Sequence, residues 1–184
     1  MARSNAQRGS ARNPIEEAQE RFTSAWGQMA GAWGISRTMA EVHALLYVTG
    51  EALCTDDVME HLQISRGNAS MSLRALQDWG LITRVHKRGD RKEYFEAESD
   101  VWTMFRTIAR ERKKRELDPL LASLYEIRDL TRDTKSDETA ARINGRLDTM
   151  LDFVETIEAV SRSFLSPDGN GLEDAVVRLT QTED

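Results

Sequence analysis

The stretch SRGNASMSLRALQDWGLITRVHKRGDRKEYFE, residues 65–96, decides the fold. Ser65 is a good N-cap, because its hydroxyl can accept a hydrogen bond from the first turn of a helix, and Gly80 is a typical helix stop. The residues between them are therefore predicted to form a helix. Residues 81–85 and 93–97 are predicted to form two strands joined by a tight, glycine-containing turn.

The residues before this stretch predict two more helices. Residues 39–48 carry apolar side chains at helical spacing. Thr55 is predicted to cap a short helix, with Asp56 and Asp57 in its first turn complementing the helix dipole. The order helix, short helix, turn, capped helix and hairpin is typical of a winged helix-turn-helix domain. We assign this domain to residues 37–100.

The helix after Ser65 has an apolar face and a small, polar face. At about 100° per residue, its apolar side chains gather on one side and are expected to anchor it to the core. The opposite side offers Asn68 and Arg74, which can read adenine and guanine in the major groove of DNA. Arg66 and the free N–H groups of the first turn suit phosphate. The residues expected to contact DNA from this helix are Ser65, Arg66, Gly67, Asn68, Ser70, Met71 and Arg74.

The hairpin tip is strongly basic. Gly89, the residue expected to have a positive φ angle, lies among four cations that could reach a flanking minor groove or the DNA backbone. These cations are Lys87, Arg88, Arg91 and Lys92. A basic turn alone is often only a solvated loop, and a capped amphipathic helix alone is common. The prediction of DNA binding therefore depends on the helix and the wing occurring together in this order.

The remaining residues are predicted to be mostly helical and to form the frame of a dimer. Residues 1–13 are small, polar and basic, and are predicted to be a disordered arm. A helix in residues 14–36 is expected to contribute to dimerisation. Residues 101–166 are predicted to be a helical dimerisation region that Pro119 should break or kink, and residues 167–184 a short tail.

The last long helix is the basis of the dimer prediction. Its apolar residues recur at spacings of three and four, as packing between helices requires. They are Ile143, Leu147, Met150, Val154, Ile157, Val160 and Phe164. A twofold dimer would place two recognition helices about 34 Å apart on a pseudo-palindromic site; the alternative is a helical bundle within one chain. The predicted fold class is mainly α (α+β), a winged helix-turn-helix with a two-stranded wing and long terminal helices.

The net charge of -6 conceals a strong asymmetry. Residues 61–92 contain seven basic and two acidic residues, a net charge of +5. Residues 116–184 contain 16 acidic and seven basic residues, a net charge of -9. Because the local field steers binding, a polyanion can bind the first region although the chain as a whole is acidic.

Composition excludes several classes of protein. There is no apolar run of about 18 residues and no signal peptide at the N-terminus, so the chain is predicted to be soluble and cytoplasmic, without a membrane partner. The single cysteine, Cys54, excludes an internal disulfide framework, and it either senses redox state or packs in the core. His43, His61 and His86 are too scattered to predict a metal site. No cofactor is predicted, and no catalytic motif supports an enzyme.

The quoted stretch is similar to the GbsR-like branch of the MarR superfamily of winged helix-turn-helix transcription regulators. The residues that carry the resemblance are 64–76, 79–82, 89–95, 102–105 and 115–120. The resemblance implies a cytosolic homodimer, with the terminal helices forming the dimer and a wing on each protomer. Some proteins of this branch sense choline or betaine through an aromatic box, which does not carry over to this chain residue by residue.

The sequence thus predicts a homodimeric regulator, a repressor rather than an activator, that binds double-stranded DNA and responds to an unidentified small molecule. Aromatic side chains are candidates for an effector cavity, although core and dimer packing explains them better. They are Phe22, Trp26, Trp33, Trp102, Phe105 and Tyr125. The alternative function is a dimeric winged-helix module that binds protein rather than DNA, which would not need four basic residues around its wing tip.

Overall fold

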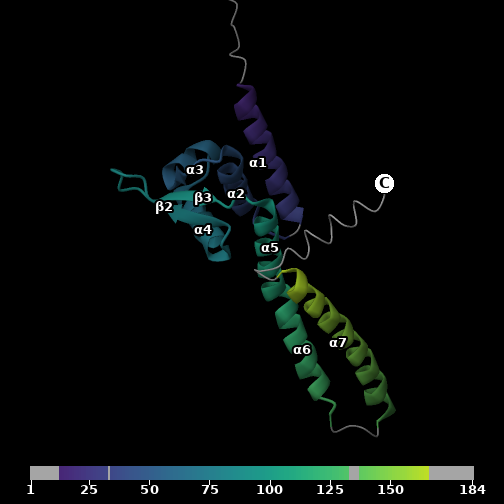
Figure 1. Ribbon diagram of the computed structural model, residues 1–184. Coiled ribbons are helices and arrows are strands. Elements are labelled where there is room, and N and C mark those ends of the chain that lie inside the picture. Colours follow the sequence, from purple (N-terminus) through teal and green to yellow (C-terminus); the bar gives the residue numbers. More distant parts are fainter. Residues whose placement is uncertain (1–12, 33, 133–136, 166–184) are drawn as a thin grey trace, which may run out of the picture. The chain divides into compact units, whose positions relative to one another are not determined.

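The computed structural model describes residues 13–32, 34–132 and 137–165 (Figure 1). These residues form two compact units that divide between Ser99 and Asp100. We call the part up to Ser99 unit 1 and the part from Asp100 unit 2, and describe each by itself. The predicted winged helix-turn-helix and the helix before it belong to unit 1, and the later helices belong to unit 2.

Unit 1 contains four helices and three strands in its described residues. Their bounds are α1 Pro14–Ala32, α2 Arg37–Thr49, β1 Leu53–Cys54, α3 Thr55–Leu62, α4 Arg66–Trp79, β2 Ile82–Val85 and β3 Tyr94–Ala97. The strand order is β1-β3-β2, and both pairs are antiparallel. The predicted mainly helical, winged helix-turn-helix fold is confirmed.

Two local predictions in unit 1 need correction. The sheet has a third strand, β1, which pairs with β3; a strand of two residues is too short to show the alternation that a sequence pattern requires. The N-cap of α3 is Cys54, and Thr55 is the first residue of the helix. The backbone N–H of Cys54 donates to Asp57 Oδ2 at 2.8 Å, so the chain turns into the helix one residue earlier than predicted.

The core of unit 1 is centred on α2, along which α1 packs on one side and α4 on another. Val42, Leu45 and Leu46 of α2 are almost completely buried, as are Leu73 and Leu76 of α4. Burying one such side chain contributes about 1.5–3 kcal/mol. The contacts of α2 with α4 therefore fix which face of α4 is directed away from the core.

His43 of α2 lies in the same core, 2% exposed. The Trp26 and Tyr47 rings lie 6.3 and 6.4 Å from its imidazole, between centroids. Its Nε2 has no hydrogen-bond partner among the described residues. Burial lowers the pKa of His43 to about 4, because desolvation disfavours the charged imidazolium.

We expect His43 to make the stability of the protein depend on pH. Its pKa is about 4 when folded and 6.5 ordinarily, so the unfolded chain binds the proton first as the pH falls. Stability is therefore lost between about pH 6.5 and pH 4, with a decrease of about 2 kcal/mol in unfolding free energy from pH 7 to pH 5. Urea unfolding of the wild type and of His43→Gln measures this. An equal pH dependence in both proteins would contradict the assignment.

Unit 2 is helical throughout its described residues. Its elements are α5 Val101–Arg112, a π-helical turn η1 Lys113–Leu117, α6 Asp118–Asp129 and α7 Glu138–Phe164. Helices α6 and α7 lie side by side and antiparallel (Figure 1). Their contact buries Leu124, Leu151 and Val154, against which Leu117, Leu121 and Leu147 pack. In the described part of the chain, no helix has the length and apolar character needed to cross a membrane.

Pro119 does not end the helical segment, so of the predicted break or kink the break is wrong. The turn η1 ends two residues before Pro119 and joins α5 to α6. A proline has no N–H for the carbonyl four residues back, and its ring would clash with that carbonyl. The backbone N–H of Asp118 donates to the carbonyl of Lys113, five residues back. The wider π-helical turn thus lets the chain pass the proline without leaving the helical conformation.

The apolar residues predicted as one stripe on α7 divide between two faces. Leu147 and Val154 pack against α6. A second row remains exposed in the single chain and consists of Ile143, Met150, Phe153, Ile157 and Val160, with exposed fractions of 37–60%. We call it the outer row of α7. It includes Phe153, which the sequence analysis did not place in the stripe.

Candidate nucleic-acid interface

Helix α4 begins and ends as predicted. The Ser65 hydroxyl accepts a hydrogen bond from the Asn68 N–H at 3.3 Å. Gly80 ends the helix with a φ angle of 75°, in the left-handed region that favours glycine, and its N–H donates to the Gln77 carbonyl at 2.9 Å. Local bonds therefore set the length of α4, and burial sets its orientation about its axis.

The two faces of α4 differ as the periodicity predicts. The buried face consists of Ala69, Ser72, Leu73, Leu76 and Trp79. Of the side chains predicted to contact DNA, Arg66, Asn68, Met71 and Arg74 are exposed and Ser70 is half-buried. Met71 is 68% exposed, which is high for an apolar side chain. These residues are accessible to a partner, and their contacts with DNA stay a prediction.

Asp56 connects the start of α4 with the base of the wing. Its carboxylate pairs with the Arg66 guanidinium and, at 3.2 Å, with the Nζ of Lys92. The hydrogen bond from Lys92 and the nearby charge of Arg66 hold the pKa of Asp56 below its usual range. Two of the predicted DNA-binding cations are thus already paired, and a phosphate has to compete with Asp56 for them. Sequence reasoning gave Asp56 only a helix-start role.

The wing is held in shape by bonds near its base. The Tyr94 hydroxyl donates to Asp90 Oδ2 at 2.7 Å, and this bond raises the pKa of Tyr94 to about 12. Lys87 Nζ donates to the Ala52 carbonyl at 2.9 Å and lies 4.1 Å from the centroid of the Tyr94 ring. Lys87 therefore has a structural role in addition to the DNA contact predicted for it.

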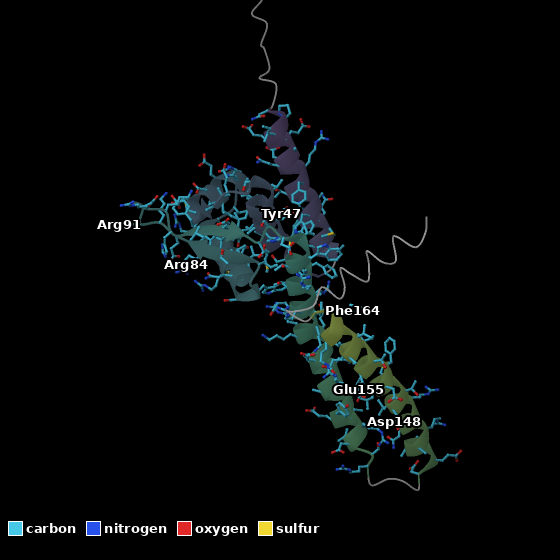
Figure 2. All side chains as sticks on the ribbon, viewed as in Figure 1. Tyr47, Arg84, Arg91, Asp148, Glu155 and Phe164 are labelled. Carbon is cyan, nitrogen blue, oxygen red and sulfur yellow. The ribbon has the colours of Figure 1, made fainter. Side chains whose placement is uncertain are left out.

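Arg88 and Arg91 are the cations at the wing tip. Gly89 between them has a φ angle of 87°, as predicted. Both arginines are exposed, and their guanidinium groups form no hydrogen bond or ion pair with other described residues. Figure 2 shows Arg91 at the far end of the wing. These two side chains can meet a polyanion without first breaking an internal bond.

Cys54 lies beside this region but is not accessible. Its side chain is 3% exposed, and Lys92 Nζ lies 3.9 Å from its Sγ. Burial favours packing over redox sensing as its role. Among the described residues, no group of three or more His, Cys, Asp or Glu is arranged to hold a metal ion.

The aromatic candidates for an effector cavity are divided between the two units. Trp33 lies outside the described residues. Trp26 belongs to unit 1 and stacks on Phe22, with ring centroids 5.8 Å apart. Trp102, Phe105 and Tyr125 belong to unit 2. A cavity shared by all of them stays a prediction.

Unit 2 has a groove of about 540 Å³ of its own. Phe105 lines it, but Trp102 and Tyr125 do not, and Tyr125 instead donates to Glu155 of α7. The other lining residues are Ala109, Arg112, Lys113, Glu116, Leu117, Leu120, Val160, Ser161, Phe164 and Leu165. Sequence reasoning missed this groove because the end of α7, which supplies part of its lining, lies far along the chain from α5, η1 and the start of α6, which supply the rest.

The capped helix α4, the small sheet and the basic wing define a winged helix-turn-helix protein. Residues 33–93, about a third of the chain, match the model of the MarR family, which confirms the resemblance of the motifs.

Two relatives and one solved structure are similar to this chain. The HTH-type transcriptional repressor GbsR of Bacillus subtilis (strain 168) is 26% identical over 112 residues, 61% of this chain and 62% of the relative. The putative HTH-type transcriptional regulator YvaV of the same organism is 24% identical over 94 residues, 51% of this chain and 53% of the relative. The matched stretches thus span less than two thirds of either relative.

A solved structure described as a transcriptional regulator has a similar fold over most of both chains. It is 22% identical, covers 89% of this chain and 99% of its own, and has a TM-score of 0.55. Each of these three proteins is described as a regulator of transcription, and none as an enzyme.

Proposed function

We propose that this protein is a sequence-specific DNA-binding transcription regulator of the cytoplasm, which acts as a homodimeric repressor on a pseudo-palindromic operator. The observation that carries the proposal is the exposed face of α4. Its buried face is anchored in the core, while Asn68 and Arg74 are exposed between small residues that let a helix approach base edges. The names of the two relatives support a role in transcription.

A selection from randomised DNA duplexes tests this function. We expect the full chain to enrich one sequence, an inverted repeat whose half-sites are about one helical turn apart. Specific binding should then exceed binding to random DNA by about 10³-fold or more. Failure to enrich any sequence would overturn the proposal and favour the alternative, a winged-helix module that binds protein.

The wing supplies affinity rather than sequence discrimination in this proposal. Arg88 and Arg91 carry the exposed charge at its tip, and Lys87 and Lys92 are engaged in internal contacts at its base. An arginine inserted in a minor groove or set against the backbone neutralises phosphate charge and releases counterions. The tip should therefore contribute on every DNA sequence.

We expect the double variant Arg88→Ala, Arg91→Ala to bind the selected duplex with a weaker dependence on salt. The slope of log K against log salt concentration should be shallower by about 1.8. This value corresponds to about 0.9 for each phosphate that the variant no longer neutralises. Fluorescence anisotropy over a range of salt concentrations measures the slope. The control is Lys114→Ala, Arg142→Ala, which removes two exposed cations of unit 2. An unchanged slope in the wing variant would contradict the wing assignment.

The outer row of α7 supports the homodimer. Its residues recur at spacings of three, four and seven along one side of the helix, beside the face that packs on α6. Such a row is typical of helix–helix packing, and a second copy of α7 supplies a matching surface. Packing against α6 leaves these side chains 37–60% exposed and so available to a second copy.

Regulation by a small molecule completes the proposal. The groove of unit 2 combines apolar side chains with the charged Arg112, Lys113 and Glu116 in its lining, which also includes Phe105, one of the predicted effector residues. A molecule that releases the protein from DNA should lower its affinity for the selected duplex in a titration. A molecule that binds the protein with no change in DNA affinity is not its effector.

A further inference from the structure

A small polar pocket lies between α4 and the strands of the wing. Its volume is about 170 Å³, and it is lined by Thr55, Ser70, Leu73, Arg74, Gln77, Arg84, Glu93 and Phe95. A water molecule takes about 30 Å³ in the liquid, so the pocket has room for a group of about five atoms. All of its residues belong to unit 1, and only Ser70 and Arg74 are among those that the sequence analysis expected to contact DNA.

The chemistry of the pocket suits an oxyanion. Leu73 and Phe95 are buried and supply its apolar lining, while the hydroxyls of Thr55 and Ser70 offer hydrogen bonds. Arg84 is held in place by Glu93, to which its guanidinium donates at 2.7 Å. The guanidinium keeps further N–H groups, since it has five donors in a planar fork that matches the geometry of phosphate.

The position of the pocket suggests which oxyanion it receives. A recognition helix lies in the major groove and a wing tip in the adjacent minor groove, and one sugar–phosphate backbone separates the two grooves. That backbone has to cross the surface between α4 and the hairpin, where the pocket lies. Figure 2 shows Arg84 on the wing, nearer the body of unit 1 than Arg91 at the tip.

We propose that this pocket seats one phosphate of the DNA backbone, with Arg84 as its main ligand. The proposal rests on the DNA-binding function proposed above and adds a contact to it. In this arrangement Arg74, which also lines the pocket, reaches the base beside the bound phosphate. Because the phosphate lies between the two grooves, Arg84 fixes the register of the protein on DNA and carries no base preference.

The variant Arg84→Gln tests the pocket, with Arg21→Gln as its control. Each substitution removes one exposed arginine and leaves one glutamate, Glu93 or Glu17, without its partner. Exposed pairs of this kind contribute little to stability, so both variants should fold. We expect Arg84→Gln to bind the selected and the random duplex about 3- to 10-fold more weakly, with a salt slope shallower by about 0.9, and Arg21→Gln to bind as the wild type does.

Replacing single phosphates of the DNA by neutral methylphosphonates then shows which phosphate the pocket holds. The selected duplex is prepared with a methylphosphonate at one position at a time, and each duplex is titrated with wild type and Arg84→Gln. We expect one position between the two grooves at which the wild type loses about 3- to 10-fold and the variant loses nothing further. If the variant loses as much as the wild type at every position, the pocket does not hold a phosphate through Arg84. If the wild type selects no DNA sequence, it is the proposed function that fails.

Discussion

Glutamate in place of Phe153 and Ile157 on α7 is expected to separate the protein into monomers and to weaken its binding to the selected inverted repeat by about 10²- to 10⁴-fold. In the single chain these side chains are 60% and 37% exposed, so the substitutions leave the core of unit 2 in place. In a dimer they would bring like charges together in an apolar contact. The loss on DNA is large because a linked second half-site binds at a high effective concentration, which a monomer lacks.

Sedimentation velocity and anisotropy on the same samples measure both effects. The matched control is Ala141→Glu, Ala159→Glu, which adds the same charge to the same helix at exposed positions outside the outer row. We expect this control to remain a dimer and to bind as the wild type does. Dimers in both variants would show that the outer row is not the interface, and monomeric wild type would contradict the homodimer itself.

Arg74→Ala is expected to weaken binding to the selected duplex by roughly 1–3 kcal/mol and to relax the preference at one base position. Arg74 is exposed on α4, one turn after Ser70, whereas Leu73 and Leu76 of the same helix are buried. Its guanidinium can bind guanine in a bidentate manner, and a lysine cannot reproduce that planar fork. Duplexes that carry each of the four bases at every position of the half-site measure the preference.

The variant Arg74→Lys separates base reading from charge. It keeps the cation, so binding to random DNA should stay close to that of the wild type, while the preference at one position should fall as it does in Arg74→Ala. An equal loss on selected and random DNA in Arg74→Ala, restored by lysine, would instead assign Arg74 to a phosphate and contradict its role in sequence recognition.

The parts of the fold that depend on local chemistry could be predicted from the sequence. The bounds of α4 follow from Ser65 and Gly80, whose bonds reach only three residues along the chain. The positive φ angle of Gly89 likewise follows from the turn between two strands. The buried face of α4 follows from its periodicity, because side chains at helical spacing face one core.

Features that depend on contacts between distant residues could not be predicted. Asp56 meets Arg66 and Lys92 only after α3, α4 and the wing have packed together. The pair of Arg84 with Glu93 requires the register of the hairpin. On α7 the sequence shows that many residues are apolar, but only the packing of α6 shows which of them remain for a partner.

Footprinting of the protein on chromosomal DNA in living cells measures directly whether it recognises specific DNA sequences through α4. We expect protected sites that share an inverted repeat, with half-site centres about 10–10.5 base pairs or a multiple of that distance apart. We also expect protection to disappear in cells that carry Arg74→Ala. Protection without a shared sequence, or no protection at all, would contradict a regulator that reads DNA through α4.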